Sequence, residues 1–408
     1  MYVNNKGAYV SKRLYEYDSR KIEKGDTFIC LPNGEPYIKE AQRRGAEVVL
    51  EMSRKEMGVL ANRYFNFPSK KLCVIGITGT NGKTTVASLV AQLLEKVGYK
   101  PAVLGTLSSA LTTPESLDTQ EFMADHYLNG GTHVVMEVSS HGIDQNRVDE
   151  IDFDYKLLTN ISQDHLDYHG TFENYRSVKM RFMSDFPGAP IYPEEYQATE
   201  IAFKSPLLGQ FNYDNMKAAV TLLQKLGIDD DSINSGLSVA KAPPGRFELI
   251  DEGQDFLTIV DYAHTPDGVS NVLKTAREIA NAQCGRVLTL FGCGGDRDRL
   301  KRPLMREAVV AYSDYYIITQ DNPRTEDESQ IVQDIIQGLD KDSEQYDIIN
   351  DRREAISSLI EKARKGDVVM IVGKGHETYQ ILKSGTIDFD DRKEARSVLR
   401  RMNNSLLD

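Results

Sequence analysis

The chain has 408 residues, a length that predicts two or three domains of ordinary size. With 40% apolar and 27% charged residues, its composition is that of an ordinary globular protein. It has 49 Lys+Arg against 61 Asp+Glu, and the resulting net charge of −12 argues against a general nucleic-acid binder. The four cysteines form no C-x-x-C pair, so neither a zinc ribbon nor a disulfide framework is indicated. The start, MYVNNKGAYVSKR, lacks an apolar signal core, and no run approaches the ~18 apolar residues of a membrane span, so we expect a cytoplasmic protein without membrane insertion.

The first half of the chain indicates an α/β arrangement with a parallel sheet. Residues 1–70 resemble a small mixed unit that ends at a linker-like sequence, NFPSK. The apolar run Leu72–Ile77 predicts a buried strand, and the following apolar residues predict an amphipathic helix that ends at Gly98. Two more strands are expected at His133–Val138 and Lys156–Thr159.

A second α/β stretch begins near Gly245, after the predicted hinge Ala242–Gly245. Almost every predicted strand of the chain leads directly into a polar or glycine-rich cluster, and open parallel sheets bind ligands at the carboxyl ends of their strands. The sequence therefore predicts ligand-binding crevices at these ends. The strands of the second stretch are expected at Leu257–Asp261, Arg286–Phe291, Tyr315–Thr319 and Asp367–Val372.

The segment TGTNGKTT, between a predicted strand and a predicted helix, has the setting of a phosphate-binding loop. Its glycines let backbone N–H groups turn toward phosphates, Lys83 adds a positive charge, and Thr84 can ligate Mg²⁺. The strict Walker spacing places glycine at position 77, where this chain has Ile77. The loop comprises Gly79, Thr80, Asn81, Gly82, Lys83, Thr84 and Thr85.

Charged and histidine side chains follow the next strands. Glu137 ends the run HVVME and would be a natural Mg²⁺ ligand if its strand neighbours the phosphate loop. A histidine alone is more often structural than a ligand, but three of the chain's seven histidines, His141, His165 and His169, gather beside Asp164 and Asp167. This clustering favours a functional role for the three histidines, along one wall of a site.

Two further groups of charges are ambiguous from the sequence alone. Lys179 lies on a predicted helix, 173–183, where its position by itself indicates a solvated lysine. The segment GGDRDRLKRP and the later Asp321–Arg324 both follow predicted strands. Arginine suits a carboxylate or phosphate, so these loops can hold a zwitterionic amino acid, but a solvated charged loop explains them equally well.

The motifs taken together resemble the Mur ligases in order and spacing, over most of residues 15–400. They are TGTNGKTT, MEVSSHG, NISQDHLDYHG, GQFNYDNMKAA, GRFE, DYAHTPD, GCGGDRD, DNPRTED and GKGHETYQI. The likeness is greatest to the MurE type, the UDP-N-acetylmuramoyl-peptide ligases that add the third amino acid of the peptidoglycan stem. The resemblance implies an ATP-dependent amide ligase that uses Mg²⁺ and forms an acyl phosphate, acts on small molecules, and is a monomer.

The resemblance also implies a three-domain α/β architecture and a role for each domain. Residues 1–70 would bind the nucleotide sugar, residues 71–243 would form the central ATPase, and residues 244–408 would form a Rossmann-like domain that binds the amino acid. Lys83, Glu137, His165 and Lys179 would be catalytic, with Lys179 carbamylated by CO₂ and Thr84, Glu137, His165 and Lys179 around magnesium.

Further residues are carried over by motif. Besides the phosphate loop, ATP would be held by Asn215, Arg246 and Asp261. The UDP-muramoyl-peptide would contact Ser19, Thr112, Thr113, Ser139, Gln145 and Arg147. The pocket for meso-diaminopimelate would comprise Arg297, Asp321, Asn322, Pro323, Arg324, Gly373 and Glu377, with Arg324 on its distal carboxylate.

Two departures from the family keep other functions open. Only 29 residues separate Lys179 from Gly209, where the family has a far longer segment, and the N-terminal domain is short. A ligase of the same superfamily acting on another carboxylate, of polyglutamate or secondary-metabolite type, is the second hypothesis. The third is an ATP-binding partner module without turnover, against which the joint presence of Lys83, Glu137, His165 and Lys179 argues.

Overall fold

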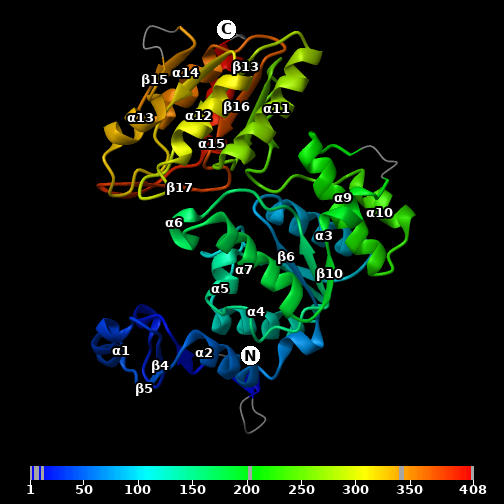
Figure 1. Cartoon of the computed structure of the whole chain (residues 1–408), viewed down its shortest axis with the longest axis vertical. Coiled ribbons are helices and arrows are strands. Elements are labelled where there is room, and N and C mark those ends of the chain that lie inside the picture. Colours follow the sequence, from blue (N-terminus) through cyan, green and yellow to red (C-terminus); the bar gives the residue numbers. More distant parts are fainter. Residues whose placement is uncertain (1, 4–8, 11–12, 201–204, 340–343, 406–408) are drawn as a thin grey trace. The chain divides into compact units, whose positions relative to one another are not determined.

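The computed structural model describes residues 2–3, 9–10, 13–200, 205–339 and 344–405 (Figure 1). The chain divides into two compact units. The first contains the described parts of 1–160, 176–203 and 217–237, and the second those of 161–175, 204–216 and 238–408. None of the described helices is long and apolar enough to cross a membrane.

The N-terminal part of the first unit contains a three-stranded parallel sheet in the order β3-β4-β5. Helix α2 begins with a capping box, in which Ser53 and Glu56 satisfy each other's backbone N–H groups. Its Met57 and Ala61 pack against Leu117 of α4 (Ser116–Leu128). The elements are β1 (Tyr2–Val3), β2 (Tyr9–Val10), β3 (Tyr15–Glu16), η1 (Ser19–Lys21), β4 (Thr27–Cys30), η2 (Glu35–Tyr37), α1 (Ile38–Arg44), β5 (Val48–Glu51) and α2 (Arg54–Tyr64).

The segment expected to be a linker, 66–70, is packed instead. It contains most of the 3-10 helix η3 (Pro68–Lys71), in which Pro68 and Ser69 are buried. The Ser69 hydroxyl accepts a hydrogen bond from the backbone N–H of Asp152 at 3.2 Å. Proline suits the first position of this turn, because its fixed φ matches a helix and it has no N–H to leave unpaired.

A five-stranded parallel sheet in the order β10-β9-β6-β8-β7 forms the centre of the first unit. Strand β6 is central and apolar because helices cover both faces of such a sheet. The apolar face of α3 is buried as its spacing predicts, and the helix ends at Lys96, two residues before Gly98, whose φ is 92°. The strands are β6 (Cys73–Thr78), β7 (Pro101–Leu104), β8 (His133–Glu137), β9 (Tyr155–Leu158) and β10 (Ala189–Ile191).

Helices surround this sheet or connect it to the second unit. They are α3 (Lys83–Lys96), α4 (Ser116–Leu128), α5 (Ser140–Asp144), α6 (Leu166–His169), α7 (Phe172–Asp185), α8 (Pro193–Gln197), α9 (Gln210–Lys225) and α10 (Asp230–Leu237). Helices α7 and α9 each begin in the second unit and end in the first.

The second unit is built on a six-stranded sheet in the order β11-β12-β16-β13-β14-β15, parallel except at β11. Side chains alternate between the two faces of a strand, so successive residues of these strands pack into two different hydrophobic cores. Leu288 and Leu290 pack with α14 and α15, whereas Val287 and Phe291 pack with α11, α12 and α13. The strands are β11 (Glu248–Leu249), β12 (Leu257–Asp261), β13 (Val287–Phe291), β14 (Tyr315–Ile318), β15 (Tyr346–Ile348), β16 (Val368–Val372), β17 (Tyr379–Leu382) and β18 (Gly385–Asp388).

The α/β class and the predicted inner strands are confirmed, with boundaries that move by at most one residue. The helices of this unit are α11 (Pro266–Ala282), α12 (Lys301–Tyr312), α13 (Glu328–Ile336), α14 (Arg352–Glu361) and α15 (Asp391–Ser405). Strands β17 and β18 form a separate antiparallel hairpin.

Candidate active site

The predicted phosphate loop lies between β6 and α3, at the carboxyl end of the central strand. Gly79 and Gly82 have φ of 144° and 87°, a region open mainly to glycine. A Cβ at Gly79 would overlap the Thr159 hydroxyl, so the loop has room only for backbone there. The Lys83 ammonium donates to the carbonyls of Gly79 and Thr80, both at 2.8 Å. Two carbonyls of the loop therefore bind the ammonium of the loop's own lysine.

Asn160, which follows β9, supports this loop from the neighbouring strand. Its backbone carbonyl accepts from the N–H of Thr80 at 2.8 Å, and its side-chain Oδ1 accepts from the N–H of Asn81 at 2.9 Å. Its Nδ2 donates to the Asn81 carbonyl at 3.1 Å. The sequence interpretation missed this role, although Asn160 lies in the NISQDH motif directly after a predicted strand.

Glu137 is buried at the end of β8, beside the phosphate loop, because β8 pairs directly with β6. Its Oε2 accepts from the Thr84 hydroxyl at 2.8 Å, and its Oε1 accepts from the backbone N–H of Thr106 at 2.9 Å. Thr106 was also missed, since nothing in its local sequence distinguishes it. Carboxylate and hydroxyl oxygens are the donors that Mg²⁺ prefers, so Glu137 and Thr84 fit this ion.

Four of the residues predicted to contact the peptide substrate form a chain of hydrogen bonds next to Glu137. The Thr113 hydroxyl donates to the Glu137 carbonyl at 2.9 Å and accepts from the backbone N–H of Ser139 at 2.9 Å. Arg147 donates to the Thr113 carbonyl at 2.8 Å and to Gln145 Oε1 at 2.5 Å.

The two remaining residues of this predicted set lie differently. The Thr112 hydroxyl lies 3.1 Å from that of Thr106 and so joins the same network. Ser19 is in η1, where its hydroxyl donates to Glu40 at 2.8 Å.

Lys179 on α7 is buried, with 1% of its surface exposed, which contradicts the solvated lysine that its position alone indicated. Its ammonium donates to the Gly79 carbonyl at 2.8 Å. Lys83 donates to the same carbonyl, so both lysines converge on one point of the phosphate loop. Position along the helix could not reveal this, because the face of α7 that is buried depends on tertiary packing.

The histidine-rich segment that contains His165 and His169 belongs to the second unit. His165 has a φ of 53°, and its Nε2 lies 3.4 Å from Asp164 Oδ2. Burial raises the pKa of Asp164, but the positive charges of His165, His264 and Lys301 outweigh it and lower that pKa. Asp164 is therefore an anion that neighbouring cations stabilise.

Two of the predicted nucleotide residues of the second unit, Arg246 and Asp261, lie at the end of β12. Asp261 is buried, and its two oxygens accept from the backbone N–H groups of Phe247 at 2.6 Å and Ala263 at 2.7 Å. Burial nevertheless raises its pKa. The Arg246 guanidinium lies 4.3 Å from the centre of the Tyr262 ring, a cation–π contact. Asn215, on α9, is 9% exposed.

The DNPR loop, residues 321–324, follows β14 and is held by the hairpin. The Arg324 backbone N–H donates to the Ile381 carbonyl at 3.1 Å, and Gln380 donates to the Asp321 carbonyl at 2.8 Å. Arg324 has a φ of 55°, and its guanidinium donates to the Gly295 carbonyl at 2.8 Å. Asp321, Asn322 and Pro323 are buried, whereas Arg324 is partly exposed.

The remaining predicted pocket residues flank this loop. Gly373 has a φ of 115°, and a Cβ there would lie 2.7 Å from Asp321 Oδ2. Glu377 accepts from the side-chain amide of Asn322 at 2.9 Å. The structure thus brings together five of the predicted residues, Asp321, Asn322, Arg324, Gly373 and Glu377.

The arginines of the GGDRDRLKRP segment divide into two kinds. Arg302 is fully buried and bonds Glu326 and Asp334 at 2.6 and 2.8 Å, and the exposed Arg299 also pairs with Asp334, at 2.9 Å. These two therefore hold the loop in place. Arg297 is exposed, and its guanidinium donates to the Asp296 carbonyl at 3.2 Å.

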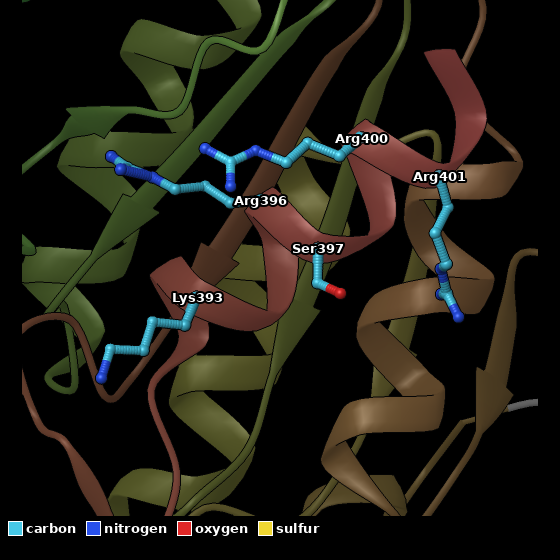
Figure 2. Close-up of a pocket in the computed structure, with 5 residues that line it drawn as sticks. All are labelled: Lys393, Arg396, Ser397, Arg400 and Arg401. Carbon is cyan, nitrogen blue, oxygen red and sulfur yellow. The ribbon is translucent and has the colours of Figure 1, made fainter. Parts of the chain in front are cut away.

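A shallow cavity of about 400 Å³ lies along α15, lined by Lys393, Arg396, Ser397, Arg400 and Arg401 (Figure 2). Figure 2 shows Arg396 and Arg400 extending in the same direction, while Arg401 points away from them. Arg400 pairs with Glu252 at 2.8 Å, and Arg396 lies 3.4 Å from Glu248. Acidic neighbours compensate the charges of Arg396 and Arg400, so this cavity is not a second candidate for the active site.

Two family models match the chain: the Mur ligase middle domain at residues 77–192, and the Mur ligase, glutamate ligase domain at residues 245–375. Curated relatives include UDP-N-acetylmuramoyl-L-alanyl-D-glutamate–2,6-diaminopimelate ligases from Syntrophomonas wolfei, 40% identical over 461 positions, and Geobacillus kaustophilus, 37% identical over 463 positions. In both comparisons 94% of this chain and 94% of the relative are covered.

Solved structures give the same result for the fold. A structure of a UDP-N-acetylmuramoyl-L-alanyl-D-glutamate–2,6-diaminopimelate ligase has a TM-score of 0.60 at 31% identity, covering 97% of this chain and 98% of that one. MurF ligase from Thermotoga maritima, in complex with ADP, has a TM-score of 0.66 at 16% identity, covering 95% and 97% of the two chains.

Proposed function

Because the chain belongs to the Mur ligase family, we propose that it joins meso-diaminopimelate to UDP-N-acetylmuramoyl-L-alanyl-D-glutamate at the expense of ATP. It is an ATP-dependent ligase of peptidoglycan precursor synthesis, acts on small molecules, and uses ATP and Mg²⁺. The observation that carries the proposal is the cluster around Gly79, where Lys83 and Lys179 share one carbonyl and Thr84 bonds Glu137.

The first half-reaction is an in-line attack by the peptide's terminal carboxylate on the γ-phosphate of ATP, which yields an acyl phosphate and ADP. The backbone N–H groups of the loop and the Lys83 ammonium would neutralise the phosphates. Glu137 and Thr84 would hold Mg²⁺, which supplies charge neutralisation to the phosphoryl oxygens. Asn160 would keep the loop rigid while the substrates exchange.

The carbamylation of Lys179 is part of the proposal. In this step the neutral amine attacks CO₂, a C–N bond forms, and one proton is released. The product is an oxygen donor in place of a cation, and oxygen donors suit a second Mg²⁺. What supports it is the burial of Lys179 beside the phosphate loop, where its side chain reaches the Gly79 carbonyl at 2.8 Å.

The second half-reaction is attack by the amine of the bound amino acid on the acyl phosphate, which releases phosphate and forms the amide. The proposed pocket is Arg297, Asp321, Asn322, Pro323, Arg324, Gly373 and Glu377. Arg324 would bind the distal carboxylate, because a guanidinium matches its geometry. Exclusion of water from this site would protect the intermediate from hydrolysis.

The remaining assignments follow from the family pattern. The nucleotide would be held by residues 79–85 with Asn215, Arg246 and Asp261, and the UDP-muramoyl-dipeptide by Ser19, Thr112, Thr113, Ser139, Gln145 and Arg147. His165 would complete the magnesium site. We further propose a division at 1–70, 71–243 and 244–408, a monomer, and a cytoplasmic location, where ATP and the nucleotide sugar are available.

A different acceptor is the second candidate, favoured by one observation. The alignment with the Syntrophomonas wolfei relative spans 461 positions, more than the 408 residues of this chain, so this chain lacks segments that the relative has. We expect one of these segments between Lys179 and Gly209, where the family pattern is longer. A ligase trimmed there would act on another carboxylate while keeping its amino-acid pocket.

The test is phosphate release from ATP with UDP-N-acetylmuramoyl-L-alanyl-D-glutamate and each candidate amino acid, followed by the mass of the product. We expect release with meso-diaminopimelate and a product heavier by one diaminopimelate less water. Release that needs a different carboxylate would favour the second candidate. No release with any acceptor would favour an ATP-binding module without turnover.

A further inference from the structure

A fully buried lysine, Lys374, lies beside the DNPR loop and has no part in the steps above. It follows β16 and Gly373, whose left-handed backbone turns the chain there. Its ammonium donates to Glu377 Oε2 at 2.8 Å and to Asn322 Oδ1 at 3.1 Å, and it lies 5.6 Å from the centre of the Tyr379 ring. A buried cation needs such compensation.

These contacts fix the orientation of the Asn322 side chain. Its Oδ1 accepts from Lys374 and also from the backbone N–H of Ile381 at 2.9 Å. An ammonium and a backbone N–H only donate, so the oxygen of the amide must face them. The amide nitrogen is thereby directed to Glu377 Oε2, at 2.9 Å.

The same arrangement fixes the carboxylate of Glu377. Its Oε2 accepts from both Lys374 and Asn322, whereas its Oε1 makes no hydrogen bond within the described part of the chain. The Glu377 side chain is 13% exposed, so it is mostly buried but still accessible to a ligand. One oxygen is thus held by the protein and the other is available to the ammonium group of a ligand.

We propose that Lys374 is a positioning residue for the incoming amino acid, acting through Asn322 and Glu377. This inference rests on the proposed function. Without the lysine, the Glu377 carboxylate would lose the cation that holds its Oε2 at 2.8 Å. Glu377 would then rotate away or take a proton, and the amino group of the substrate would lose its partner.

The test replaces Lys374 with methionine, which keeps the length and removes the charge. In Lys374→Met the KM for meso-diaminopimelate is expected to rise on the order of 10- to 100-fold, while the KM for ATP and for the UDP-muramoyl-dipeptide stays within about twofold. The matched control is Lys156→Met. Lys156 is an equally buried lysine of the first unit that bonds the Met183 carbonyl at 2.8 Å, so its loss lowers stability without raising the KM for the amino acid.

A double-mutant cycle separates positioning from general damage. If Lys374 acts through Glu377, the variant carrying both Lys374→Met and Glu377→Gln uses diaminopimelate no worse than Glu377→Gln alone. Losses that add in the double variant, or an unchanged KM in Lys374→Met, would overturn the inference while the ligase assignment stands. A wild type that never uses diaminopimelate would overturn the proposed function and this inference with it.

Discussion

The phosphate loop of the first unit and the DNPR loop of the second are built by different means. The phosphate loop depends on backbone: Gly79 has no room for a side chain, and Asn160 holds two of the loop's N–H groups from the next strand. The DNPR loop depends on side chains, with Asn322 and Glu377 oriented by the buried Lys374. The first arrangement would accept any phosphate chain, whereas the second would distinguish one amino acid from another.

This difference predicts how each site fails. A site made of backbone fails when the charge of Lys83 is removed or when a side chain is added at one of its glycines. The use of every substrate is then expected to fall alike. A site made of oriented charges loses selectivity first, because each charge reads one group of the ligand. The variants below test that distinction in order of expected effect.

Lys83→Ala is expected to have the largest effect. It removes the charge that would neutralise the transferred phosphoryl group, and a loss of about a thousandfold or more in ATP turnover is expected. The fold should remain intact, because Lys83 begins a helix whose buried residues lie on other positions. The measurement is phosphate release together with the circular dichroism spectrum. Turnover equal to wild type would refute the phosphate-loop assignment.

Lys179→Ala is expected to lose nearly all activity and to regain part of it with added acetate. Acetate supplies the carboxylate that the carbamate would provide, in the cavity left by the shortened side chain. Lys156→Ala, which opens a similar buried cavity away from the phosphate loop, should show no gain from acetate. A Lys179→Ala variant as active as wild type, with no added mass on Lys179 in the wild type, would contradict carbamylation.

Asp334→Asn is expected to have the smallest effect, on the charge network that holds the GGDRDR loop. The hydrogen bond from Arg299 lowers the pKa of Asp334 from 3.8 to about 2. Its contribution to stability is therefore present above pH 3.8 and is lost as the pH falls through about 2. Wild type should be more stable than the variant by about 1 kcal/mol between pH 5 and 7, since solvent screens part of the pair.

The control for this effect is the pH profile itself. The difference in free energy of unfolding between wild type and Asp334→Asn, from urea titrations, should shrink below pH 3.8. A difference that grows toward acid pH would show that Asp334 does not act as a stabilised anion.

The sequence predicted the phosphate loop more completely than the amino-acid pocket, for a physical reason. The strand, the glycine-rich turn and the helix are contiguous in the chain, so the geometry of Gly79–Thr84 is local and its glycine pattern predicts it. Lys374 and Asn322 lie far apart in the chain, and their meeting depends on the order of the strands. The burial of Lys179 likewise depended on which face of α7 packs, which the charge pattern did not reveal.

The most direct test of the central claim is the ratio of kcat/KM for meso-diaminopimelate to that for lysine, in wild type and in Arg324→Ala at saturating ATP. The two amino acids differ by the distal carboxylate that Arg324 would bind. Losing such a charge pair costs ~2–5 kcal/mol, or about 30- to several-thousand-fold in kcat/KM. We predict that wild type prefers diaminopimelate and that Arg324→Ala loses this preference while its KM for ATP stays unchanged. A wild type that prefers lysine, or a variant that loses both amino acids equally, would contradict the account.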